Sequence, residues 1–289
     1  MRRLFTTAEF LATGGTVEQL RWGVKKGSWV RAAHGVYADG PEPVDALTAE
    51  IARVRARDSF AAGLLATTLH DLDGAEAAPK FKLRRGELIA GALIDADGVR
   101  CTNGLQTVID AAALVDDLVW EQMLECALRP IKKRRPRLFK LDELVALLPT
   151  LERSRTPGVA RMRRVLALRP PSAPPTESML ETLAVQMCRV TAGVPEPQRQ
   201  VRVYDEYREF VARVDLAWPE LGVFFELDGE GHKNQPKYDA ARESAVVAAT
   251  GWLGIRCTWT EVRFNPVATG RKLARVLDQA RLRPTVAAK

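Results

Sequence analysis

The alternation of hydrophobic and polar positions divides the first 40 residues into two short helices and a β-hairpin. Residues 6–15 and 16–27 have apolar side chains at helical spacing, and each segment begins with threonine and ends with glycine, as capped helices do. Residues 28–40 alternate around a bend near Gly35, which is typical of a hairpin. Helix, short turn, helix and hairpin is the order of a winged helix-turn-helix. The sequence therefore predicts a DNA-binding head at residues 1–40.

The second helix of such a head enters the major groove, so its exposed side chains should be polar or cationic. Leu20 and Val24 lie about one helical turn apart, and we expect both to face the core. The residues then left to contact DNA, from this helix and from the wing, are Gln19, Arg21, Trp22, Lys25, Lys26, Arg31 and His34. A winged helix that contacts only other proteins is the alternative.

The middle of the chain, residues 41–169, has mostly helical patterns. Apolar residues recur at helical spacing in residues 46–57, 104–128 and 141–154, and shorter β-like stretches cover residues 80–85 and 86–94. His70 follows an apolar stretch, and we interpret it as structural rather than as a metal ligand. The sequence DADG at residues 95–98 lacks the other ligands of a calcium loop and predicts a turn.

A proline-rich segment, residues 167–178, separates this middle part from the rest. It has four prolines in twelve positions, and proline interrupts both helices and strand ladders, so we expect a domain boundary here. A helix follows from Thr176 or Ser178, with Ser178 and Glu181 spaced as in a capping box. The order of patterns in residues 170–289 is αβββαβα, an α/β sandwich. The fold class expected for the whole chain is α/β (α+β overall).

Charge is distributed unevenly. Residues 129–169 hold 13 Lys and Arg against 3 Asp and Glu, and such segregation indicates contact with a polyanion, because cationic side chains displace counterions from phosphates. The densest run supplies four further candidate nucleic-acid contacts, Lys132, Lys133, Arg134 and Arg135. The alternative is a solvated basic loop between helices.

Composition places the chain among globular proteins, with 46% hydrophobic residues. No apolar run approaches the ~18 residues of a membrane span, and no apolar core follows the first two arginines as in a secretory signal. We therefore expect a cytoplasmic protein without a membrane partner. The four cysteines form no CxxC pair and are interpreted as buried thiols.

The most distinctive acids lie in residues 214–232, VDLAWPELGVFFELDGEGH. A hairpin centred between Glu220 and Leu221 would place Asp215 opposite Glu226, and strand alternation puts Asp228 on the same face as Glu226. Opposed like charges destabilise paired strands unless a cation lies between them. Mg²⁺ is suitable because it prefers oxygen ligands and is held by one or two carboxylates. Solvent-facing acids at a strand end are the alternative.

With these residues, the carboxy-terminal half resembles the restriction-endonuclease-like superfamily, in particular a bacterial branch related to the very-short-patch-repair (Vsr) mismatch endonucleases. The resemblance rests on TESMLE, RVDLAWPELGVFFELDGEGH, YDAARE and GWLGIRCTWTEV. The amino-terminal TAEFLATGGTVEQLRWGVKKGSWVRAAHGVYA is similar to the winged-helix head of AbiEi-type antitoxins. Together the two resemblances span nearly the whole chain.

The resemblance implies a catalytic site of Asp215, Glu226 and Asp228 with a helix glutamate, Glu177, holding Mg²⁺ or Mn²⁺ against a phosphate. Nucleases of this fold usually carry lysine where Asp228 stands. His232, at the position of a Vsr-type catalytic histidine, or Lys233 or Arg242 would replace it. Glu177 could instead only favour the start of its helix.

The expected function is therefore Mg²⁺-dependent cleavage of nucleic acid, with DNA as partner. A non-catalytic DNA-binding regulator of the antitoxin type, with a cognate toxin or another protein as partner, is the alternative.

Overall fold

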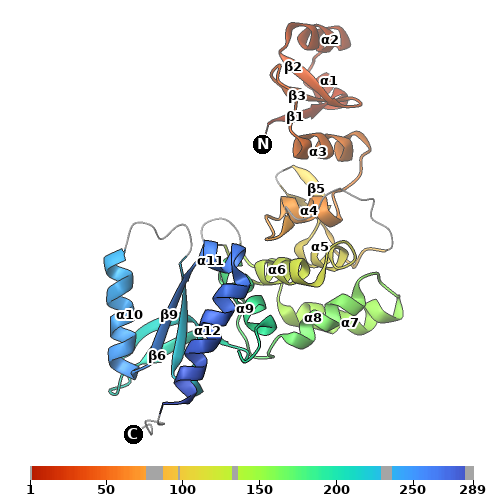
Figure 1. Ribbon diagram of the computed structural model, residues 1–289. Helices are drawn as coiled ribbons and strands as arrows, with labels where there is room; N and C mark the ends of the chain where they lie inside the picture. The colour runs from red at the N-terminus through yellow and green to blue at the C-terminus, as the bar shows by residue number, and fades with distance from the viewer. Residues whose placement is uncertain (1, 76–86, 97, 132–135, 229–235, 284–289) are drawn as a thin grey trace. The chain divides into compact units, whose positions relative to one another are not determined.

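The computed structural model describes residues 2–75, 87–96, 98–131, 136–228 and 236–283 (Figure 1). It divides into two compact units: unit 1 is residues 1–123 with 138–164, and unit 2 is residues 124–137 with 165–289. The boundary that we expected before residue 170 thus falls inside unit 2. Among the described residues, no helix has the length and hydropathy needed to cross a bilayer.

Unit 1 begins with a three-stranded sheet in the order β1-β3-β2, flanked by two helices. The elements are β1 (Leu4–Thr6), α1 (Thr7–Ala12), α2 (Val17–Lys26), β2 (Trp29–Ala33) and β3 (Val36–Asp39). Both expected helices and the hairpin are confirmed, because their signals are local: Thr6 and Thr16 each form a capping box, and Gly27 ends α2 in the left-handed conformation. The strand β1 was not expected, since only its pairing with β3 defines it.

The side of α2 that faces the core differs from the prediction at one position. Leu20 is buried as expected, but Val24 is 38% exposed and Gly23 is buried in its place. A Cβ atom on Gly23 would lie 2.0 Å from the Trp29 ring, so only glycine allows the helix to approach the indole so closely. The expectation that Val24 faces the core was wrong because the large Trp29 ring fills that space.

The rest of unit 1 is mainly helical. Its elements are α3 (Ala46–Ala56), α4 (Gly63–Leu69), β4 (Leu93–Ala96), β5 (Val99–Thr102), α5 (Gly104–Ala111), α6 (Asp117–Leu128), α7 (Leu141–Arg153) and α8 (Val159–Leu168), of which the last residues of α6 and α8 belong to unit 2. Buried Ile51, Leu65 and Val99 form a core that Leu4 of the first sheet also contacts. Arg55 of α3 donates to the Leu4 carbonyl at 2.8 Å, so residues 1–40 are joined to α3.

Several middle-region predictions are settled by these elements. The pattern at 104–128 forms two helices rather than one, because Asp116 accepts a hydrogen bond from the backbone of Val119 and starts a new helix. A turn joins β4, which ends at Ala96, to β5, which begins at Val99, as expected; the Gly98 N–H donates to Asp95 Oδ1 at 2.8 Å, and Asp97 lies outside the described residues. His70 is buried and structural, with its Nε2 2.7 Å from the Thr102 carbonyl oxygen. Of the β-like stretch 86–94, only the last two residues belong to a strand, β4 (Leu93–Ala96). The other stretch, 80–85, lies outside the described residues.

Unit 2 contains a four-stranded sheet in the order β6-β7-β8-β9, antiparallel except for the parallel pair β8 and β9. Its elements are α9 (Met179–Val190), β6 (Gln198–Tyr204), β7 (Phe210–Trp218), a 3₁₀ turn η2 (Pro219–Leu221), β8 (Val223–Asp228), α10 (Pro236–Thr250), β9 (Leu253–Thr258), α11 (Trp259–Phe264) and α12 (Pro266–Arg281). The expected order αβββαβα is confirmed, with α11 added before the last helix.

Two apolar layers cover this sheet. Leu216, Phe225 and Ile255 pack against α9, α11 and α12 on one face, while Val214 and Phe224 pack against Val246 of α10 on the other. Figure 1 shows α10 on one side of the sheet and α9 and α12 on the opposite side. The strands are therefore apolar on both faces, and the polar residues described next lie where these layers end. All four cysteines are buried thiols, as expected.

Candidate active site

The site is centred on two carboxyl groups from adjacent strands, Asp215 of β7 and Glu226 of β8, here called the carboxyl pair. The β7–β8 ladder pairs Leu216 with Phe225, so the next position places Asp215 opposite Glu226, as the hairpin length predicted. Glu226 is only 3% exposed. The two carboxyl groups lie close enough for each to affect the pKa of the other. Asp215 Oδ2 accepts from the Leu227 backbone N–H at 2.9 Å.

Burial and mutual repulsion make full ionisation of the carboxyl pair unfavourable. Burial, followed by the charge of Asp215, raises the pKa of Glu226 to about 8, while Arg242 acts in the opposite direction. Burial also raises the pKa of Asp215, although the Leu227 N–H offsets part of this. The two groups titrate as a unit. At neutral pH the pair therefore retains a proton. A bound cation could replace this proton by neutralising the negative charge of the two carboxylates.

One cationic side chain lies beside the pair. Arg242 of α10 donates from Nη2 to Glu226 Oε2 at 2.8 Å. Of the three side chains proposed to replace the usual lysine, Arg242 is the one that the structure places next to the acids. His232 and Lys233 lie outside the described residues.

Another carboxylate, the buried Glu181 of α9, lies close to the pair and was not among the predicted site residues. Burial raises the pKa of Glu181 to about 7, and the charge of Asp215 adds to this effect. The sequence suggested a capping box with Ser178, but only half of it forms: Ser178 Oγ accepts from the Glu181 N–H, whereas Glu181 Oε2 accepts from the Glu177 N–H at 3.0 Å. Its spacing of four and seven residues from buried Val185 and Cys188 is a signal that could have placed Glu181 on the inner face of the helix.

Gln200 of β6 orients Glu181 and was also missed. Its Nε2 donates to Glu181 Oε2 at 2.8 Å. Gln200 has φ +54° inside a strand, and the β6–β7 ladder passes over it, pairing Arg199 with Leu216 and Val201 with Val214. Non-glycine residues rarely adopt this left-handed conformation, and when they do it is often at functional sites. No local sequence signal indicates it.

Two predicted acids have cationic partners of their own. Asp228 accepts from Arg256 Nη1 at 2.8 Å, and Arg256 also lies 3.4 Å from Glu243. Glu177, whose side chain is 44% exposed, pairs with Arg213 at 2.7 Å. Both lie near the carboxyl pair but are not part of its hydrogen bonds. Within the described ranges, no group of three or more His, Cys, Asp and Glu side chains has the spacing of a metal site.

The oxygen donors nevertheless fit a hard divalent cation. Mg²⁺ usually keeps several waters and is held by one or two carboxylates together with substrate phosphate. Asp215 and Glu226 would supply those two carboxylates, because two facing carboxylates on adjacent strands favour a positive charge between them. Glu181 lies near enough to Asp215 for the charge of Asp215 to raise its pKa. It would stand beside the metal-binding carboxylates without binding the metal itself.

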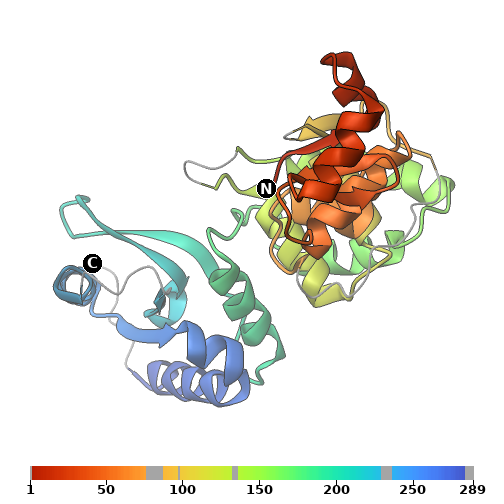
Figure 2. The ribbon, with the colours of Figure 1, turned by 90° about the horizontal axis from the view of Figure 1, so that it is seen from above.

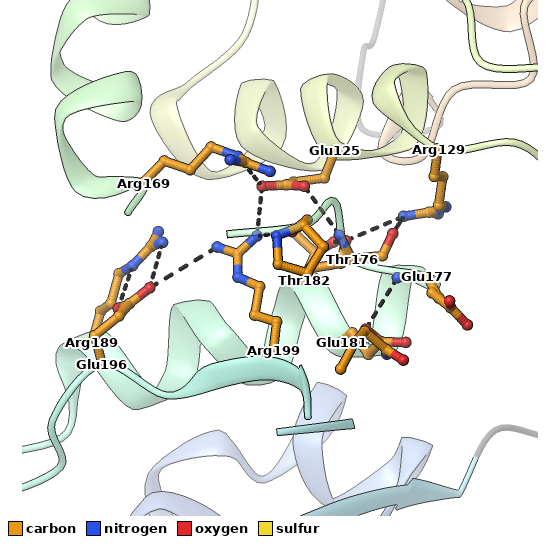
Figure 3. Close-up of polar contacts among 12 residues, drawn as sticks. Glu125, Arg129, Arg169, Thr176, Glu177, Glu181, Thr182, Arg189, Glu196 and Arg199 are labelled. Carbon is orange, nitrogen blue, oxygen red and sulfur yellow. Dashed lines mark hydrogen bonds and ion pairs between the residues drawn. The ribbon is translucent and has the colours of Figure 1, made fainter. Parts of the chain in front are cut away.

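A buried ionic network between α6 and the start of α9 holds α9 in place (Figure 3). Glu125 of α6 accepts from Arg169 Nε at 3.1 Å, from Arg199 Nη1 at 2.8 Å and from the Thr176 N–H at 3.1 Å. Arg129 donates to the carbonyl and hydroxyl oxygens of Thr176. The proline-rich segment is therefore not an open linker: Arg169 and Thr176 at its two ends are buried.

This network positions the two segments that carry Glu181 and Gln200. Thr176 directly precedes Glu177 and the start of α9, and its hydroxyl is 2.7 Å from that of Thr182. Arg199 directly precedes Gln200. The network thus fixes both segments that deliver Glu181 and its hydrogen-bond donor to the carboxyl pair, although none of its members was predicted.

The predicted DNA contacts of residues 1–40 are all exposed. They are Gln19, Arg21, Trp22, Lys25, Lys26, Arg31 and His34. Three of them make local contacts: Gln19 Oε1 accepts from the Thr16 N–H at 2.8 Å, the Lys26 ammonium lies 5.4 Å from the Trp22 ring centroid, and Arg31 Nη2 lies 3.1 Å from His34 Nδ1. These side chains are accessible, and they cover one helix face and the hairpin.

Part of the basic excess of residues 129–169 is engaged within the chain where the structure describes it. Arg161 and Arg164 both pair with Asp117, and Arg163 pairs with Glu152, while Arg129 and Arg169 are buried in the network around Glu125. Lys132, Lys133, Arg134 and Arg135, the predicted contacts, lie outside the described residues. This region therefore gives weaker support to a polyanion contact than its sequence does.

Comparison of the chain with protein-family models, with curated proteins and with solved structures gave no match. The resemblances to Vsr endonucleases and to AbiEi-type antitoxins therefore stay predictions.

Proposed function

We propose that the chain is a Mg²⁺-dependent nuclease, most simply a DNA endonuclease, with its active site in unit 2 and a winged-helix DNA-binding head at residues 1–40. The observation that supports this best is the carboxyl pair: the half-buried Asp215 and the buried Glu226 face each other on adjacent strands. A stable fold alone has no need of such a pair, because buried like charges destabilise it. Unit 2 would then be a restriction-endonuclease-like domain.

In this proposal Asp215 and Glu226 bind Mg²⁺ or Mn²⁺, and the bound metal would lower the pKa of a water and stabilise charge on the phosphoryl oxygens. Arg242, 2.8 Å from Glu226, keeps positive charge beside the acids and occupies the role that lysine usually has in nucleases of this fold. Gln200 orients the Glu181 carboxylate. His232 remains the proposed general base, since its ordinary pKa of ~6.5 allows proton exchange near neutrality.

The alternative is a DNA-binding regulator of the antitoxin type that has lost catalysis. The contact that favours it is the ion pair between Asp228 and Arg256, because an acid held by its own cation stands where lysine would be expected. A regulator would need the exposed basic face of α2 but not the acids of unit 2. The two proposals therefore differ in what a substitution at Asp215 would change.

A cleavage assay distinguishes them. Purified protein would be incubated with Mg²⁺ or Mn²⁺ and with duplex, nicked, mismatched and single-stranded DNA, and with RNA. We expect cleavage that EDTA stops and that Asp215→Asn abolishes without loss of DNA affinity. Asp278→Asn, at an exposed acid of α12 that pairs with Arg281, is the matched control and should cut like the wild type. If the wild type cuts no substrate faster than Asp215→Asn, the regulator takes its place.

A further inference from the structure

The hairpin of β6 and β7 continues outward from the carboxyl pair and carries two arginines side by side. Arg202 and Arg213 are cross-strand partners and both are exposed. Like charges directly opposite each other destabilise a sheet. Arg213 is paired with Glu177, but within the part of the chain that the structure describes, no carboxylate lies within ion-pair distance of Arg202. One positive charge is thus left over on this face.

The next cross-strand pair outward is aromatic. Tyr204 and Phe210 are partners across a β-bulge, they are 47% and 59% exposed, and their rings lie edge to face with centroids 6.1 Å apart. Strand alternation puts Tyr204 on the same face as Arg202, opposite to the face where Val203 and Ala212 are buried. Proteins that bind single-stranded nucleic acid commonly use exposed aromatic side chains, next to basic residues, to stack on the bases.

Along the hairpin, the carboxyl pair, the arginine pair and the aromatic pair follow one another, as the scissile phosphate, the next phosphate and its base would in a bound strand. Gln200 and Asp215 lie at the inner end, the arginine pair follows two residues later, or about 7 Å along the strands, and the aromatic pair follows after another such step. Figure 2 shows this hairpin running away from α9 towards its turn. The turn itself carries Asp205, Glu206 and Glu209, which would repel phosphate and limit the surface to the middle of the hairpin.

We propose that this face of the hairpin, Arg202 with Arg213 and Tyr204 with Phe210, binds a single-stranded stretch of nucleic acid beside the cleavage site. Arg202 holds the phosphate next to the one that is cut, and the aromatic rings stack on its base. The base must be unpaired, because only an unstacked base exposes its faces to side chains. This inference deepens the proposed nuclease function by naming the structure of its substrate.

Binding measurements on the full chain in EDTA test the proposal without requiring cleavage. The probes are a fluorescein-labelled 20-nucleotide DNA single strand and the same strand in a duplex. We expect Arg202→Gln to weaken single-strand binding about three- to tenfold and to lower the slope of log K against log salt by about 0.7, with Arg202→Lys retaining most of the affinity. Phe210→Ala should weaken single-strand binding about tenfold and duplex binding much less. Arg275→Gln, at an exposed arginine of α12, is the control.

A stability measurement separates a binding role from a structural one. Because Arg202 faces Arg213, Arg202→Gln should leave the melting temperature unchanged or raise it while affinity falls. Wild-type affinity in both Arg202→Gln and Phe210→Ala, or equal losses on single strand and duplex, would overturn the proposal. If the chain cuts nothing but these variants lose single-strand affinity, the nuclease proposal fails and the binding surface stands. If the chain cuts and the variants bind as the wild type does, only the surface fails.

Discussion

Replacing Asp215 by Asn should stabilise the metal-free protein at alkaline pH, because it removes a negative charge beside Glu226 and keeps a hydrogen-bonding side chain there. Asparagine has nearly the same volume, its side-chain oxygen can still accept from the Leu227 N–H, and its amide can donate to Glu226. The variant therefore resembles the wild type with the proton of the pair fixed in place. A substitution that removes a charge needed only for metal binding should behave in this way.

The sign and the size follow from the pKa of Glu226. Because the folded state raises this pKa from 4.5 to about 8, the folded protein binds more protons than the unfolded chain between these values. Stability from this group is thus complete below pH 4.5 and is lost as pH rises through 8. At about 1.4 kcal/mol per pH unit, the loss is about 5 kcal/mol. Burial, the largest cause, remains in the variant, so Asp215→Asn should recover only part of this loss.

Urea unfolding at pH 5, 7 and 9 in EDTA, followed by far-UV circular dichroism, measures this difference. The variant should be more stable than the wild type at pH 9 and nearly equal to it at pH 5, whereas Asp278→Asn should follow the wild type throughout. Adding Mn²⁺ at about 100 times its Kd should raise wild-type stability by about 2.7 kcal/mol and leave the variant unchanged. A variant that is less stable at pH 9, or that gains as much from Mn²⁺, would refute the electrostatic reasoning.

Three further predictions concern the surrounding residues. Glu125→Gln leaves buried Arg169 without its carboxylate and Arg199 with only the longer contact to Glu196 at 3.9 Å. It should lower the free energy of unfolding by about 3–5 kcal/mol, seen as a lower urea midpoint; a loss under 1 kcal/mol would mean that the network is not needed. Gln200→Gly relieves the left-handed backbone but removes the donor to Glu181, so stability should stay within about 1 kcal/mol while cleavage falls at least tenfold, and unchanged cleavage would speak against a positioning role. Lys25→Ala with Lys26→Ala should weaken DNA binding for all sequences and reduce the salt slope by about one per lost contact; equal slopes in a salt titration would count against a DNA-binding head.

Local signals in the sequence determined most elements and one central feature of the site. A cap or a turn depends on residues three or four positions apart, which is why Thr16, Gly27 and the β4–β5 turn were found where expected. The opposition of Asp215 and Glu226 was predictable for the same reason: hairpin length sets the register, and strand alternation sets the face.

What the sequence could not show depends on partners far away in the chain. Glu181 belongs to the site only because α9 packs beside β7, and Gln200 takes a left-handed conformation that no neighbouring residue requires. Glu125 contacts Arg199 across 74 positions. The burial of the two ends of the proline-rich segment depends on this network, so its proline content alone could not predict it. Gly23 replaces Val24 at the core because Trp29 occupies the space beside it. Short-range rules fix secondary structure and register, but the partners of a buried charge are chosen only when the elements pack together and exclude water.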